Sequence, residues 1–148
     1  LINEVSSGAL LYYIDNQTVT FLLLHYFRGH WDFPKGNKEK GESDIDTALR
    51  EIAEETGITD VTILDGFKKE IFYKYKRNNQ LMSKKVVYFL AKTNSTDVRL
   101  SSEHLDFVWE QYEDALKRIT YKNSKEILDE GYKFLINSLN SKIQTTNE

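Results

Sequence analysis

Residues 36–58 read GNKEKGESDIDTALREIAEETGI, and the fold is best approached from this stretch. Ser43 is a favourable helix N-cap, and Asp46 three residues later completes a weak capping box. Gly57 is the residue type that most often follows the end of a helix. Between these signals the apolar residues recur at helical spacing, at Ile45, Ala48, Leu49, Ile52 and Ala53. The stretch therefore predicts an amphipathic helix that lays this stripe against a core.

Three glutamates lie on the other side of the predicted helix. At about 100° per residue, Glu51, Glu54 and Glu55 share one arc of about 100° opposite the apolar stripe. Glu51 and Glu55 are four residues apart, a spacing at which like charges repel by roughly 0.2–0.5 kcal/mol. A divalent cation reverses that repulsion, and carboxylate oxygens suit Mg²⁺ or Mn²⁺ rather than zinc. The alternative is an acidic face that is simply solvated.

The flanking segments alternate between strand and loop patterns. Two runs rich in Leu, Tyr, Val and Phe flank residues 15–17, which predicts a hairpin. Residues 28–41 contain three glycines and the only proline, and are predicted to form no regular element. Strands mixed with three helices indicate an α/β or α+β fold. The predicted strands are 8–14, 18–26, 61–64, 66–75, 84–92 and 105–111, and the other helices are 112–119 and 124–139.

Length and composition narrow the classes of protein. A chain of 148 residues is expected to form one domain, 1–148, with a polar tail over 137–148 that frays. The net charge of −3 argues against a general nucleic-acid-binding protein. The absence of Cys excludes disulfides, zinc–thiolate sites and cysteine nucleophiles. No apolar stretch approaches the ~20 residues that span a bilayer, so we expect a cytoplasmic protein without a membrane partner.

Charge is divided between two segments. Residues 36–60 carry a net charge of −5 and residues 66–85 a net charge of +6. The first segment suits cations and the second suits a polyphosphate. Tyr73 and Tyr75 alternate with the lysines of the basic segment, an arrangement that favours stacking of a nucleobase. A lysine-rich strand edge that prevents aggregation is the alternative interpretation.

The residues of the opening stretch also fit a longer pattern. Gly36, Glu42, Arg50, Glu51, Ile52, Glu54, Glu55, Gly57 and Ile58 match G-x5-E-x7-R-E-U-x-E-E-x-G-U, where U is apolar. This resembles the Nudix box of hydrolases that cut nucleoside diphosphates linked to another moiety. The resemblance implies an α/β/α sandwich with a mixed β-sheet and a catalytic loop–helix–loop.

The resemblance also implies roles for the box residues. It makes Glu51 and Glu55 ligands of Mg²⁺, or of Mn²⁺, and Glu54 a ligand or the catalytic base. The carbonyl of Gly36 is a further implied ligand, and Arg50 is expected to orient a catalytic glutamate. For Glu42 the resemblance leaves open whether it ligates through water or braces the loop.

Shorter runs resemble the asymmetrical diadenosine tetraphosphate hydrolases of the animal and archaeal type. They are His30–Gly36, Gly66–Glu70 followed by Tyr73, Glu103-His104 before Trp109, and Glu130–Leu135. This resemblance implies that His30, Lys35 and Lys84 contact the phosphates, that Tyr73 and Tyr121 sandwich an adenine, and that Glu103 completes the metal site or acts as base. The chain departs from that pattern at Asn37, at Lys40 and in a longer loop expected over 77–83.

The implied function is Mg²⁺-dependent hydrolysis of a dinucleoside polyphosphate by a monomeric enzyme. Diadenosine tetraphosphate would give ATP and AMP through attack of water on an outer phosphorus. The alternatives are an RNA 5′ pyrophosphohydrolase, a house-cleaning nucleoside triphosphate pyrophosphohydrolase, an enzyme acting on inositol pyrophosphates, and a non-catalytic nucleotide sensor. Apart from RNA 5′ ends, no nucleic-acid partner is expected.

Overall fold

The structure is a computed structural model that describes residues 2–147, with side chains over residues 3–142. The strands are β1 (Ile2–Asp15), β2 (Thr18–Tyr26), β3 (Trp31–Asp32), β4 (Lys35–Asn37), β5 (Val61–Arg77), β6 (Gln80–Thr93) and β7 (His104–Glu110). The helices are α1 (Asp44–Thr56), α2 (Tyr112–Arg118) and α3 (Lys122–Asn147).

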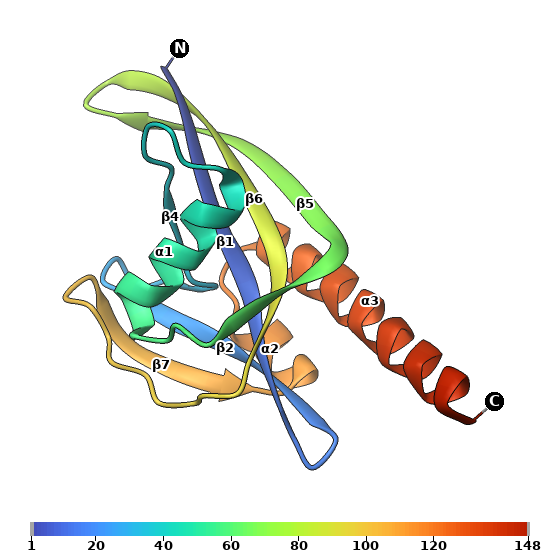
Figure 1. Cartoon of the computed structure of the whole chain (residues 1–148). Coiled ribbons are helices and arrows are strands. Elements are labelled where there is room, and N and C mark those ends of the chain that lie inside the picture. The colour runs from blue at the N-terminus through green and yellow to red at the C-terminus, as the bar shows by residue number, and fades with distance from the viewer. Residues whose placement is uncertain (1, 148) are drawn as a thin grey trace.

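Within residues 2–147 the strands form one mixed sheet with β1 at its centre (Figure 1). β1 pairs in parallel with β6 from Ile2↔Met82 to Tyr12↔Lys92. The other edge of β1 is shared, because β4 pairs with its first half and β2 with its end, both antiparallel. β5 extends the sheet beyond β6, while β3 and β7 pair with β2. This topology places β4, which leads into α1, beside the strand that α1 covers.

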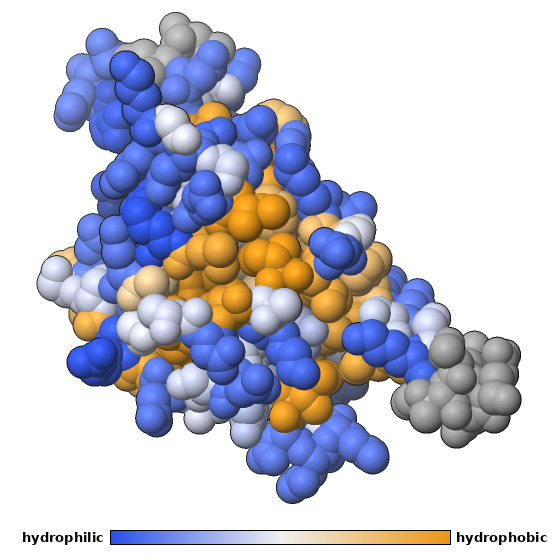
Figure 2. All heavy atoms as spheres, viewed as in Figure 1, coloured by the Kyte–Doolittle hydropathy of each residue, from blue (hydrophilic) through white to orange (hydrophobic). Residues whose placement is uncertain are grey.

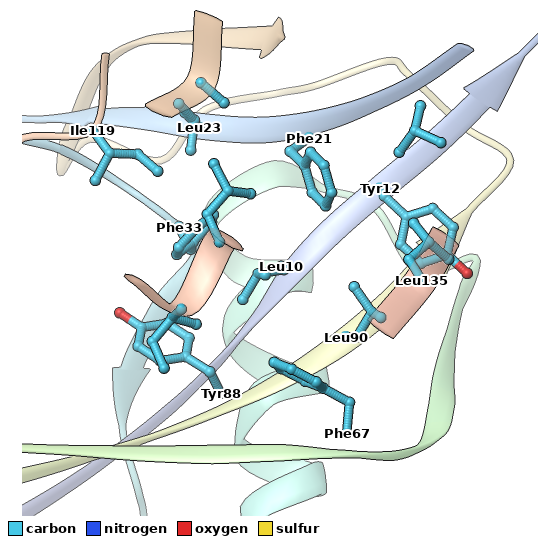
Figure 3. Close-up of a cluster of buried hydrophobic side chains, with 14 of the residues drawn as sticks. Leu10, Tyr12, Phe21, Leu23, Phe33, Phe67, Tyr88, Leu90, Ile119 and Leu135 are labelled. Atoms are coloured by element: carbon cyan, nitrogen blue, oxygen red, sulfur yellow. The ribbon is translucent and has the colours of Figure 1, made fainter. Parts of the chain in front are cut away.

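Alternation along β1 divides the apolar core between the two faces of the sheet. Leu10 and Tyr12 belong to a cluster with residues of α2 and α3, whereas Ala9 and Leu11 belong to a cluster with residues of α1. Figure 3 shows the first cluster, in which Leu10 lies among aromatic rings that include Phe33. Helices therefore cover both faces of a mixed sheet, which confirms the predicted sandwich.

The caps of α1 are those that the sequence predicts. The Ser43 hydroxyl accepts a hydrogen bond from the backbone N–H of Asp46 at 3.1 Å. Gly57 adopts a left-handed conformation with a φ of 76°, and its N–H donates to the carbonyl of Ala53 at 2.9 Å. Only glycine adopts this conformation without a steric penalty, so Gly57 ends the helix here.

The buried face of α1 differs from the predicted stripe. Ile45 is 42% exposed, and the buried residues of the helix include Thr47 and Glu55. Glu55 was expected beside Glu51 and Glu54 on the outer arc, yet it is only 3% exposed. Hydrophobicity alone cannot predict this, because the Glu55 carboxylate is buried with polar partners supplied by β4 and β7.

Other segments differ from the sequence predictions as well. The segment 28–41, expected to lack regular structure, contains β3 and β4, since their backbones complete ladders with β2 and β1. The longer loop expected over 77–83 is a two-residue turn at Asn78 and Asn79, both with positive φ, which suits a tight hairpin. The described part of the polar tail expected over 137–148 belongs to α3, which extends to Asn147.

The side of the molecule that carries α1 shows hydrophobic residues gathered near its centre and framed by hydrophilic ones (Figure 2). In the part of the chain that the structure describes, no helix is both long and apolar enough to cross a membrane.

Gly8 is the residue through which β1 and β4 approach most closely. A Cβ at this position would overlap with the carbonyl oxygen of Pro34 and with Lys35. We expect Gly8→Ala to lower the free energy of unfolding by about 1–3 kcal/mol, because β4 must move away from β1. Urea denaturation measures this, with Asn3→Ala, an exposed position of the same strand, as the control. A Gly8→Ala stability equal to that of the wild type would contradict the close approach.

Candidate active site

The backbone of β4, just before the loop that leads into α1, lies close to a carboxylate of the helix. β4 pairs Gly36 with Ser7 of β1, beneath α1. A Cβ on Gly36 would overlap with the carboxyl group of Glu51. The backbone of the loop and the carboxylate of the helix therefore share one small volume, as a metal site built from a carbonyl and carboxylates requires.

Arg50 is the centre of the acidic cluster. Its Nε donates to Glu42 Oε2 at 2.7 Å, and its second terminal nitrogen donates to the carbonyl of Asn37 at 2.8 Å. Its first terminal nitrogen donates to Glu51 Oε1 at 2.9 Å and to Glu54 Oε2 at 3.1 Å. Arg50 thus contacts Glu42, Glu51 and Glu54 at once. Glu42 Oε1 accepts a hydrogen bond at 2.8 Å from the backbone N–H of Glu39 in the same loop, and this contact braces the loop.

Glu55 is the most buried of the box glutamates. Its Oε1 accepts the backbone N–H of Lys35 at 2.9 Å, and its Oε2 lies 2.9 Å from His104 Nε2. The Ser101 hydroxyl lies 3.0 Å from the other ring nitrogen of His104. Burial raises the pKa of Glu55 to about 7, although His104 and the Lys35 amide oppose the shift.

The carboxylates are arranged so that a cation would relieve an electrostatic cost. Burial raises the pKa of Glu51, Arg50 opposes the shift, and the charges of Glu54 and Glu103 add to it. Among residues 3–142 no three His, Asp or Glu side chains already form a metal-binding group. The donor set nevertheless consists of hard oxygens that repel one another, with the Gly36 backbone against Glu51. These residues fit a divalent cation of the Mg²⁺ or Mn²⁺ type.

A cavity of about 1130 Å³ opens beside this cluster. It lies between the turn after β2, the junction of α2 with α3, and the β5–β6 hairpin. Its lining contains all six residues that the resemblance implies for substrate and for the distant acid, namely His30, Lys35, Tyr73, Lys84, Glu103 and Tyr121.

The basic side chains of the cavity differ in their protonation. Burial would lower the pKa of Lys35, but the nearby Tyr88 and Asp32 oxygens outweigh it and hold that pKa well above its ordinary value. Burial lowers the pKa of Lys84, which also lies near Lys35. Burial lowers the pKa of His30, although Asp32 partly opposes the shift. At neutral pH the cavity thus presents a fixed ammonium charge at Lys35 beside a mainly neutral imidazole.

Aromatic rings build the wall around His30. Tyr26 stacks on His30 with ring centroids 4.6 Å apart and planes 8° apart. Tyr121 lies 5.4 Å from the same imidazole and is 51% exposed, which leaves much of its ring free. Tyr73, from the facing strand β5, is half-buried and lies 6.1 Å from Tyr75. These rings suit a flat aromatic ligand.

The residues of the Nudix helix fall into two groups by their contacts. Arg50 forms ion pairs with Glu51 and Glu54, whereas Glu55 points inward to His104, which is distant in the sequence. Three supporting residues were not predicted: His104 as the partner of Glu55, Tyr26 as the platform of His30, and Asp32 as the partner of Lys35. Of these three, only Asp32 could have been suspected from the sequence, because an acid three residues before Lys35 is close enough to pair with it.

Comparison with known proteins finds similarity over most of the chain. The NUDIX domain matches residues 5–130. The mouse protein bis(5′-nucleosyl)-tetraphosphatase [asymmetrical] is 41% identical over 128 residues, 82% of this chain and 84% of its own. The protein of the same name from Caenorhabditis elegans is 36% identical over 135 residues, 88% of this chain and 95% of its own. A crystal structure of a C. elegans Ap4A hydrolase binary complex superposes with a TM-score of 0.81 and 33% identity, covering 90% of this chain and 98% of that one.

The raised pKa of Glu55 predicts a dependence of stability on pH. The folded chain keeps a proton on Glu55 up to a pKa of about 7, whereas the ordinary value is 4.5. With divalent cations chelated, this group's contribution to the free energy of unfolding is therefore present at low pH and lost as the pH rises from 4.5 to about 7. Urea denaturation across this range should show the loss in the wild type but not in Glu55→Gln. The exposed Glu113→Gln should follow the wild type, and parallel curves for the wild type and Glu55→Gln would contradict the shift.

Proposed function

The chain belongs to the NUDIX family, and from that premise we propose that it is a hydrolase of dinucleoside polyphosphates that converts diadenosine tetraphosphate into ATP and AMP. The similarity to asymmetrical bis(5′-nucleosyl)-tetraphosphatases over most of the chain supports this activity. The observation that carries the proposal is the cavity, whose lining combines cationic side chains such as Lys35 and Lys84 and aromatic side chains such as Tyr73 and Tyr121 with the carboxylate of Glu103.

NUDIX hydrolases use a divalent cation, and we propose that it is Mg²⁺ in this chain, with Mn²⁺ able to replace it. Glu51, Glu54, Glu55 and Glu103, with the carbonyl of Gly36, are the groups proposed to hold it. When bound, the cation lowers the pKa of a coordinated water and neutralises charge on the phosphate oxygens.

The chain's own residues supply the proton transfer and the electrostatic stabilisation. Glu54 or Glu103 takes the proton of a water whose oxygen forms a new bond to an outer phosphorus. The bridging P–O bond breaks in line with that attack, and its electrons remain on the leaving phosphate. The ammonium of Lys35 and the imidazole N–H of His30 stabilise the developing charge, and Lys84 contacts the chain of phosphates farther along.

The aromatic wall supplies recognition of the base. Tyr73 of β5 and Tyr121 from the α2–α3 junction both line the cavity, and their rings are proposed to hold one adenine between them. We propose further that the enzyme is one domain that acts as a monomer in the cytoplasm.

Identification of the products tests the proposed reaction. Diadenosine tetraphosphate, a 5′-triphosphorylated RNA and a panel of nucleoside triphosphates are incubated with Mg²⁺ in H₂¹⁸O, and the products are separated by chromatography. We expect ATP and AMP from the dinucleotide, with ¹⁸O in AMP. Two molecules of ADP would contradict asymmetrical cleavage, and faster hydrolysis of the RNA would favour a 5′ pyrophosphohydrolase. Nucleotide binding without metal-dependent turnover would indicate a sensor.

Glu55→Gln tests the carboxylate cluster. The amide preserves the shape and an acceptor for the Lys35 N–H but removes the negative charge. We expect the fold to persist and kcat to fall by about 10²–10⁴, the scale of losing a charge-stabilising or acid–base group. Steady-state kinetics measure kcat, and circular dichroism measures folding. A variant with near wild-type turnover would remove Glu55 from the mechanism.

Tyr121→Ala tests the aromatic wall. Stacking holds the ground state and the transition state alike, so its loss should raise KM with a modest change in kcat. Because Tyr121 is half-exposed, the substitution should leave stability nearly unchanged. Steady-state kinetics with diadenosine tetraphosphate provide the measurement, with Tyr13→Ala, a partly buried tyrosine outside the cavity, as the control. An unchanged KM would show that Tyr121 does not hold the base.

A further inference from the structure

Asp32 is a buried carboxylate that the proposed reaction does not use. It is only 1% exposed, lies at the end of β3, and belongs to the lining of the cavity. Burial of an ionised carboxylate is costly unless other groups compensate the charge, so its partners indicate its role. Its Oδ1 accepts the backbone N–H of Phe33 at 2.8 Å, which leaves Oδ2 for groups from elsewhere.

Two side chains share the second oxygen of Asp32. The ammonium of Lys35 lies 3.4 Å from Oδ2, and the hydroxyl of Ser124 donates to the same oxygen at 3.2 Å. Ser124 is itself 2% exposed and stands in the first turn of α3. One buried oxygen therefore joins the phosphate-facing lysine to the start of a helix that is 92 residues from Asp32 in the sequence.

The neighbour of Asp32 holds the other end of the same segment. The backbone N–H of Trp31 donates to the Thr120 hydroxyl at 2.8 Å, and the Thr120 N–H donates to the carbonyl of Trp31 at 3.2 Å. The two residues of β3 thus hold the segment 120–124 at both of its ends. Tyr121 lies between these attachments, with its ring beside His30.

We propose that Asp32 is a positioning residue: through Oδ2 it directs the Lys35 ammonium toward the phosphate chain and, through Ser124, fixes the segment that carries Tyr121. The nature of the ligand rests on the proposed function, whereas the arrangement of the side chains does not. If Asp32 only stabilised the fold, the effect of its substitution on kcat/KM would be the same whether or not Lys35 was present.

Asp106 provides a matched control. Like Asp32, it lies in a strand paired with β2 and accepts the N–H of the following residue, here Phe107, at 2.8 Å. Unlike Asp32, it is exposed and lies outside the cavity. Asp106→Asn therefore repeats the chemical change and the local hydrogen bond without the contacts to a lysine and to α3.

A double-mutant cycle tests whether Asp32 acts through Lys35. Asp32→Asn keeps the size of the side chain and its acceptor oxygen but removes the charge. We expect it to lower kcat/KM for diadenosine tetraphosphate by about 10- to 100-fold, the effect of misplacing a substrate-binding group, and to change it less than about 2-fold when Lys35 is already Met. Equal losses in both backgrounds would overturn the proposal, as would an equal loss in Asp106→Asn.

Binding of inorganic tripolyphosphate separates this proposal from the proposed function. Calorimetric titration with tripolyphosphate and Mg²⁺ measures the affinity for a phosphate chain in the absence of a nucleoside and of dinucleotide hydrolysis. Asp32→Asn should weaken binding in the wild-type background and leave it nearly unchanged in Lys35→Met. If the wild type binds the probe but hydrolyses no dinucleotide, the proposed function fails while the positioning role stands. If Lys35→Met binds tripolyphosphate as well as the wild type does, the positioning role fails.

Ser124→Ala keeps the inference testable if Asp32→Asn does not fold. This change deletes one hydroxyl and leaves the carboxylate charged. We expect KM for the dinucleotide to rise several-fold with little change in kcat, because the loss loosens the segment of Tyr121. The effect should not add to that of Tyr121→Ala, since both act on the same contact. An unchanged KM, or fully additive effects, would contradict the coupling of β3 to this segment.

Discussion

The site depends on one buried carboxylate that joins three elements. Glu55 stands on the inner face of α1, accepts the Lys35 amide of β4 and faces His104 of β7. These contacts fix α1, β4 and β7, the strand that directly follows Glu103, relative to one another. Burial also raises the pKa of Glu55, so a nearby cation would stabilise its charged form. The same side chain therefore affects the stability of the fold and belongs to the proposed metal site.

Local signals predict the Nudix helix well. The caps at Ser43 and Gly57 depend on neighbours in the sequence, and the structure reproduces them. The orientation of the helix is less well predicted, because periodicity treats Ile45 as core and Glu55 as surface. Both errors have one cause. The packing of α1 is set partly by the hydrogen bond from the Lys35 N–H to Glu55 and by the contact of Glu55 with His104, and both partners lie on strands that helical periodicity does not consider.

Apart from Tyr73 and Tyr75, whose alternation with lysines favours base stacking, the predicted residues of the cavity were anticipated through resemblance to a family. Lys35, Tyr73 and Tyr121 come from separate parts of the chain, and no spacing rule relates them. Their supports were missed for the same reason, since Ser124 meets Asp32 only once β3 lies beside the start of α3. The short strands β3 and β4 escaped detection because their two or three residues carry no period of their own and depend on partners across the sheet.

The division of the site between a contiguous stretch and scattered walls has an evolutionary consequence. The groups proposed to hold the cation lie within residues 36–58 except for Glu103, whereas the lining of the cavity comes from scattered segments that include β3, β5, β6 and the α2–α3 junction. Substitutions in those walls can redirect the enzyme to another leaving group while the hydrolytic core stays intact. Proteins with this architecture can therefore change their substrate more readily than their type of reaction.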